Sequence, residues 1–124
     1  MNTRRILLEI PGPPVPKERP RKGRYGNFYT PEKTRDYEKT IRLAFILKYP
    51  RHESWAGPVS MVVMAYVKTP TDRPDGSNIL KLVEDALNGL AYRDDAQIID
   101  ARILKVKAED QAQRVTIHVK EIKP

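Results

Sequence analysis

The sequence predicts an α+β fold, a single two-layer domain over residues 1–124 with a mixed sheet and its helices packed on one face. Two segments have apolar residues at helical spacing, and four others are short apolar or alternating segments, which gives the order β-α-β-α-β-β. One sheet covered by two helices is the economical architecture for that order. A chain of 124 residues is within the common size of one domain.

The first half of the chain predicts one strand and one helix. Residues 4–10 form an apolar-rich segment that a run of prolines ends. Residues 31–48 have a helical apolar stripe, with Thr30 as a cap, Pro31 at the first helical position and Pro50 as the stop.

The second half predicts a strand, a helix and two further strands. Residues 59–68 are rich in valine and methionine and predict a buried strand. The apolar spacing predicts a helix over residues 78–88, capped by Ser77, or by Asp75 if the helix begins earlier. Gly89 suits the left-handed position after that helix.

The last two strands are expected at residues 97–106 and 114–120, joined by a polar turn over residues 107–113. In the final strand Val115, Ile117 and Val119 alternate with polar residues, which predicts one buried and one solvent-exposed face.

Positive charge is concentrated in the first half of the chain. Residues 1–58 contain 13 Lys and Arg against 6 Asp and Glu, a balance of +7, whereas residues 59–124 contain 10 of each. A basic half favours a polyanionic partner, nucleic acid before membrane. The alternative is charge that serves solubility alone.

The densest basic segment is the predicted loop over residues 17–24, where five of eight residues are basic: Lys17, Arg19, Arg21, Lys22 and Arg24. Aromatic residues follow it, and basic groups with aromatics can contact phosphates and unpaired bases. A solvated loop is the alternative. The predicted helix over residues 31–48 carries a second basic set, more simply a solvated surface: Lys33, Arg35, Lys39 and Arg42.

The chain contains no cysteine, which excludes disulfides and thiolate metal sites. No apolar run approaches the roughly 20 residues of a membrane span. The apolar run near the N-terminus is too short for a signal peptide. These features predict a cytoplasmic protein.

Carboxylates flank the second predicted helix. Asp75 precedes it, Lys81 lies on its first turns, and Asp94 and Asp95 follow it. Carboxylates so placed can converge on Mg²⁺ (or Mn²⁺), which would activate a water and neutralise phosphate charge, with a lysine adding positive charge. The simpler interpretation is a surface ion pair between Lys81 and Asp85 at i,i+4.

The same residues resemble the RusA family of Holliday junction resolvases. The similarity is carried by the stretches RPDGSNILK at 73–81, DALNG at 85–89 and DDAQI at 94–98, with KERPR at 17–21 matching a basic motif of the family. It extends over nearly the whole chain, but its specific part is residues 73–98.

The resemblance implies a homodimeric, Mg²⁺-dependent endonuclease that cuts branched DNA at four-way junctions. By position, Asp75 and Asp95 match metal-binding aspartates, Asp94 is the neighbour of the second, and Lys81 matches the catalytic lysine. Asp75, Lys81 and Asp95 are thus the expected catalytic residues. The residues expected to contact DNA are Lys17, Arg19, Arg21, Lys22, Arg24, Arg73 and Asn78.

One residue departs from the family pattern. Ser77 stands where the family usually has a second aspartate, and a neutral hydroxyl is a poorer Mg²⁺ ligand than a carboxylate. Two functions therefore remain open: a junction-cutting endonuclease, or a junction-binding protein with weak or no catalysis. A plain interaction domain ranks third.

Overall fold

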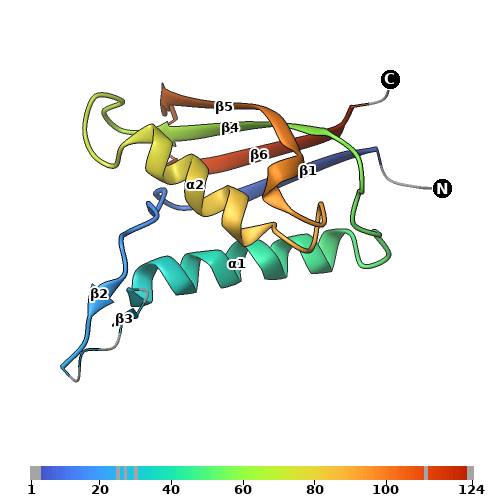
Figure 1. Ribbon diagram of the computed structural model, residues 1–124. Helices are drawn as coiled ribbons and strands as arrows, with labels where there is room; N and C mark the ends of the chain where they lie inside the picture. Colours follow the sequence, from blue (N-terminus) through green and yellow to red (C-terminus); the bar gives the residue numbers. More distant parts are fainter. Residues whose placement is uncertain (1–3, 25, 27, 30, 111, 123–124) are drawn as a thin grey trace.

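A computed structural model describes residues 4–24, 26, 28, 29, 31–110 and 112–122; for residues 21, 28 and 29 it describes the backbone alone. The molecule has two layers, a four-stranded sheet and two helices that cover one face of it (Figure 1). The predicted α+β class is therefore confirmed. None of the described helices is long and apolar enough to cross a membrane.

The sheet is mixed, with strand order β1-β6-β4-β5. Its strands are β1 (Arg5–Pro11), β4 (Val59–Val67), β5 (Ile98–Lys107) and β6 (Arg114–Glu121). β6 pairs antiparallel with β1 and β4, whereas β5 runs parallel to β4 at the edge. In β4 every second side chain is fully or nearly fully buried, so its inward face forms the centre of the core.

Helix α1 (Glu32–Lys48) lies along the β1 side of the sheet and buries Tyr37, Ile41 and Phe45. Pro31 is the residue just before the helix, and the predicted cap Thr30 lies outside the described residues. The helix ends before Pro50, as predicted.

Arg42 of α1 is a structural residue. Its Nη1 donates to the carbonyl oxygens of Ala86 and Asn88 at 3.0 and 3.4 Å, at the C-terminal end of the second helix. The arginine satisfies the Ala86 carbonyl in the last turn of that helix and the Asn88 carbonyl just beyond it. Arg42 is thus committed to joining the two helices and is not a free phosphate contact.

Helix α2 (Gly76–Ala86) packs against β5 and α1, and buries Ile79, Leu82 and Val83. It begins two residues earlier than the apolar spacing predicts, so Asp75 is the residue before it and Ser77 lies in its first turn. The prediction of Ser77 as the N-cap was wrong, and the Asp75 alternative holds.

The early start of α2 has a packing reason. A Cβ on Gly76 would lie 3.2 Å from Cγ1 of Ile103 on β5, so the missing side chain lets this end of the helix approach the sheet closely. Gly89 has the expected positive φ of 83°. It lies, however, in the turn in which its N–H donates to Tyr92, not directly after the helix.

Three short elements were not predicted. β2 (Arg21–Lys22) and β3 (Phe28–Tyr29) pair with each other in the segment between β1 and α1, and a 3-10 turn, η1 (Asp95–Gln97), precedes β5. All three are too short to leave a periodic signal in the sequence.

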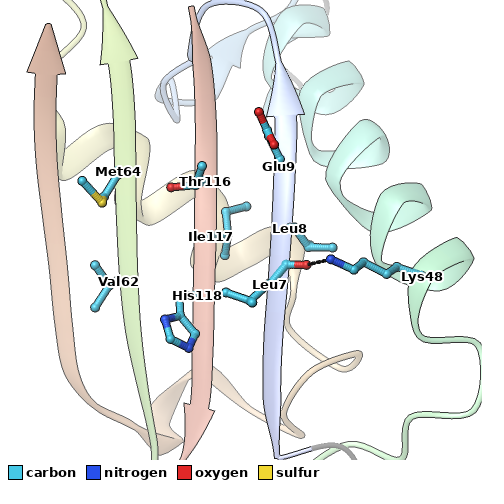
Figure 2. Close-up of a pocket in the computed structure, with 9 residues that line it drawn as sticks. All are labelled: Leu7, Leu8, Glu9, Lys48, Val62, Met64, Thr116, Ile117 and His118. Carbon is cyan, nitrogen blue, oxygen red and sulfur yellow. Dashed lines mark hydrogen bonds between the residues drawn. The ribbon is translucent and has the colours of Figure 1, made fainter. Parts of the chain in front are cut away.

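Among the described residues, no helix covers the other face of the sheet. A shallow hollow on it is lined by Leu7, Val62, Met64, Thr116 and His118 among others, and Lys48 reaches round the edge to donate to the Leu7 carbonyl at 2.7 Å (Figure 2). Burial and the charges of Arg5 and Lys120 lower the pKa of His118. This hollow lies on the face of the sheet opposite the two helices.

Candidate functional site

The centre of the candidate site is the ammonium group of Lys81, on the exposed side of α2. Its Nζ lies 3.5 Å from Oδ1 of Asp85, one turn further along the helix, and 3.9 Å from Oδ2 of Asp95 on η1. Tertiary folding therefore brings Lys81 to the predicted acid Asp95, 14 residues away in sequence, in addition to its helical neighbour. The Lys81 side chain is 54% exposed, so its charge remains open to solvent and to a ligand.

The turn that carries Asp94 and Asp95 is fixed by Gln97. Its Nε2 donates to the carbonyl oxygens of Trp55 and Gly57 at 2.7 and 2.8 Å, and its Oε1 accepts from the Asp94 N–H at 2.9 Å. The side chain of Gln97 thus ties the acidic turn to a loop that is 40 residues or more away in sequence.

That loop is itself anchored. Trp55 is buried, its N–H donates to the Ala91 carbonyl at 3.0 Å, and its carbonyl accepts from the N–H of Arg93 at 3.2 Å. The segment between α2 and η1 is thus bridged to the Trp55 loop on both sides of Tyr92. Sequence reasoning did not give Gln97 a role, although an Asp followed three residues later by Gln is a recognised signature of a capped helical turn.

Asp75 lies at the other end of α2. Both of its carboxylate oxygens accept from Nη1 of Arg73 at 3.2 Å. Asp75 lies six residues before Lys81, which corresponds to about 9 Å along the axis at 1.5 Å per residue. The structure therefore joins Lys81 with Asp95 and leaves Asp75 outside that contact.

The oxygen donors suit a hard divalent cation, although they do not form a compact cluster. Asp75, Asp94 and the Ser77 hydroxyl lie on exposed residues, and Asp95 is partly exposed. Within the described part of the chain, no three Asp, Glu or His side chains gather closely enough to hold a metal. The donor set fits Mg²⁺ or Mn²⁺ in its chemistry, because both prefer carboxylate and water oxygens.

Negative charge accumulates around Lys81. Burial raises the pKa of Glu84, Lys81 opposes that rise, and the charges of Asp95 and Asp85 add to it. Burial is the main cause of the rise, and the charge effects show that Glu84 lies within electrostatic range of Lys81, Asp85 and Asp95. Three carboxylates near one ammonium group favour a further cation.

The basic loop meets this acidic region through Lys17. Its Nζ lies 2.9 Å from Glu38 of α1 and 3.3 Å from Asp85 of α2, and its backbone N–H donates to the Asn78 carbonyl at 2.8 Å. Burial opposes the charged form of Lys17, but the hydrogen bonds to Glu38 and Asp85 outweigh it and raise the pKa of Lys17. Lys17 is therefore already paired.

The other predicted DNA contacts are placed differently. Arg19, Lys22 and Arg24 are exposed along the loop, whereas the backbone of Arg21 lies in β2 and its side chain is outside the described part of the structure. Thr34 pins the start of this loop to α1, because its hydroxyl donates to the Pro16 carbonyl at 3.1 Å. Arg73 and Asn78 are exposed at the α2 end of the site.

Two comparisons with known proteins cover both the basic loop and the acidic site. A family model described as endodeoxyribonuclease RusA matches residues 11–120. The chain is also similar to a Bacillus subtilis (strain 168) protein called uncharacterized protein YqaN, with 30% identity over 141 aligned positions that cover 94% of this chain and 96% of that protein.

Proposed function

Because this chain belongs to the endodeoxyribonuclease RusA family, we propose that it is a divalent-metal-dependent endonuclease that cuts four-way DNA junctions. The observation that carries the proposal is the contact of Lys81 with Asp95 at 3.9 Å, beside an exposed basic loop. A lysine and a carboxylate held together at the surface, next to cations that suit a phosphate backbone, support a role in phosphodiester hydrolysis.

The oxygen atoms proposed to hold Mg²⁺ or Mn²⁺ are those of Asp75, Ser77, Asp94 and Asp95. A bound divalent cation supplies Lewis-acid stabilisation of the scissile phosphate and lowers the pKa of a water ligand. Lys81 presents a fixed positive charge where negative charge develops on the phosphate, and Gln97 keeps the turn that carries Asp94 and Asp95 in place.

DNA is proposed to lie along the exposed cations of the basic loop. Arg19, Lys22 and Arg24 are free to contact phosphates, with Arg21 next to them in sequence and Arg73 and Asn78 at the start of α2. These contacts fix position and carry no sequence information by themselves.

We further propose that the 124 residues act as one domain and that two copies form a homodimer. A four-way junction has two-fold symmetry and needs two cuts, and a dimer with one site in each subunit satisfies both requirements. Light scattering on the purified protein, alone and with a junction, measures the number of copies.

A second function is favoured by Ser77 and by the separation of Asp75 from the contact of Lys81 with Asp95. With one family carboxylate replaced by a hydroxyl, the protein would bind junctions tightly and cut them slowly or not at all. Binding would then survive both EDTA and the substitution Asp95→Asn.

Cleavage of a labelled synthetic junction with Mg²⁺ or Mn²⁺ separates the two functions. We expect nicked products from the wild type, a rate lower by a hundredfold or more for Asp95→Asn, and a higher rate for Ser77→Asp because a carboxylate binds the metal more strongly. Asp36→Asn, on the exposed side of α1, is the matched control and should cut like the wild type.

No cleavage by the wild type or by Ser77→Asp, with junction binding intact, would establish the binding protein. No preference for a four-way junction over linear duplex would contradict both functions.

A further inference from the structure

A line of alternating charges connects the basic loop to the acidic turn. It runs from α1 through the loop to α2 and η1, with successive nitrogen–oxygen distances of 2.9, 3.3, 3.5 and 3.9 Å, through Glu38, Lys17, Asp85, Lys81 and Asp95. Four separate segments of the chain contribute to it. A carboxylate and a lysine thus lie between Lys17 and the proposed metal ligand Asp95.

The side chains at the Lys17 end of this line are less exposed to solvent than Lys81. The side chains of Glu38, Lys17 and Asp85 are 22%, 27% and 23% exposed, against 54% for Lys81. Ion pairs that are shielded from water are screened less by salt and hold their geometry better than exposed ones. Lys17 has two carboxylate partners, which take two of its three N–H donors and offset its positive charge, so it attracts a DNA phosphate less than an unpaired lysine does.

Asp85 is shared between two lysines. Its Oδ2 faces Lys17 and its Oδ1 faces Lys81. Without Lys17, the whole charge of Asp85 would act on Lys81 and draw the ammonium away from Asp95, which is the more distant of its two carboxylates. With Lys17 in place, the pull of Asp85 is partly neutralised, and Lys81 stays between the two acids.

We propose that Lys17 and Asp85 are positioning residues for Lys81: Lys17 holds the Asp85 carboxylate, which in turn sets where the Lys81 ammonium lies relative to Asp95. This assignment rests on the proposed function for its consequence in catalysis, but its geometry can be tested separately. It removes Lys17 from the set of phosphate contacts and leaves that role to the exposed cations of the loop.

The kinetic test compares Lys17→Met with Lys22→Met. A phosphate contact contributes about 0.9 to the slope of log K against log salt, so its loss weakens junction binding and flattens that slope. For Lys17→Met we expect binding and slope unchanged and the single-turnover cleavage rate reduced ten- to a hundredfold, because an angstrom-scale misplacement of a catalytic group has an effect of that order. For Lys22→Met we expect weaker binding and a flatter slope.

Two further variants check that the effect passes through Asp85. Lys17→Arg keeps the charge and should restore most of the rate. Asp85→Asn should slow cleavage, and combining it with Lys17→Met should add little, because both changes break the same connection. A Lys17→Met variant with weaker binding, a flatter salt slope and a normal maximal rate would overturn the proposal.

A spectroscopic test does not depend on cleavage. The ε-methylene resonance of Lys81, identified by its loss in Lys81→Arg, should shift in Lys17→Met and Asp85→Asn and stay in place in Lys22→Met. The amide spectrum of each variant shows whether it is folded. If Lys17→Met does not fold, the Lys81 resonance in Asp85→Asn alone tests the positioning role. An unchanged Lys81 resonance refutes the positioning role. If the wild type does not cut DNA but the Lys81 resonance shifts in these variants, the proposed function is refuted and the positioning role stands.

Discussion

At the scale of single residues, the acidic turn depends on one uncharged side chain. Gln97 makes hydrogen bonds to Trp55, Gly57 and Asp94, and it is partly buried. Removing it leaves the Gly57 carbonyl oxygen and the Asp94 N–H without this partner, whereas the Trp55 carbonyl keeps its bond from the Arg93 N–H. Each group left unpaired has a desolvation cost of about 1–3 kcal/mol when water does not replace the bond.

We therefore predict that Gln97→Ala lowers the free energy of unfolding by about 1–3 kcal/mol and slows junction cleavage, since Asp95 loses its fixed position. Urea denaturation measures the first effect and single-turnover kinetics the second. Gln113→Ala, at the partly buried residue before β6, is the control and should change neither. An unfolding midpoint for Gln97→Ala equal to that of the wild type would contradict the anchoring role.

Charged residues show the limit of sequence reasoning at the same scale. Arg42 and Lys17 are as basic as Arg19 and Arg24, yet the first two are bound within the protein and the others are exposed. Composition counts charge, whereas burial and partners determine whether that charge is available to DNA.

At the scale of elements, α2 carries Lys81 and Asp85 of the candidate site, and their charges act on a neighbouring carboxyl group of the same helix. Glu84 lies one residue before Asp85, and its pKa is raised by burial and by the charges of Asp95 and Asp85, against the effect of Lys81. A carboxyl group whose pKa is higher in the folded state binds its proton more tightly when folded, so its ionisation costs stability.

This cost is absent well below pH 4.5, the ordinary pKa of a glutamate side chain, grows as pH rises through the folded pKa of Glu84, and is complete above it. We predict that Glu84→Gln is more stable than the wild type at pH 7 and that the difference vanishes below pH 4.5. Thermal unfolding at several pH values measures it, with the exposed residue Glu109→Gln as control. A Glu84→Gln protein that is less stable than the wild type at pH 7 would contradict the prediction.

At the scale of the whole molecule, the basic region and the acidic region occupy separate parts of the surface, and one lysine bridges them. The exposed cations lie on the loop between β1 and α1, the acids lie at α2 and η1, and Lys17 joins them. An exposed basic surface that contacts phosphates releases counterions on binding, so affinity should fall steeply with salt.

We predict that replacing Arg19, Lys22 and Arg24 together by Gln reduces the slope of log K against log salt by about 2–3, since each phosphate contact contributes about 0.9. Binding to linear and branched DNA should weaken alike. The control triple replaces Arg51, Arg102 and Lys120, on other parts of the surface. Fluorescence anisotropy with labelled DNA at several salt concentrations measures both. An unchanged slope in the first triple would place the DNA elsewhere.

The sequence by itself determined the α+β class, the order of its main elements and the residues of its family motif. Alternation in β4 and helical spacing in α2 are local patterns, so a single segment is enough to reveal them. The ends of elements were less certain, because the start of α2 depends on how closely Gly76 can approach Ile103 of another strand.

Only the tertiary structure decided which charged groups are paired. Lys17 and Asp85 are 68 residues apart in sequence, and Gln97 reaches Trp55 over 42 residues, so no local pattern indicates either contact. The sequence named Lys81 and Asp95 but could not show that they lie together while Asp75 stays at the far end of α2. The physical reason is that secondary structure follows from neighbouring residues, whereas an ion pair between distant residues exists only once packing has fixed the distance between its charges.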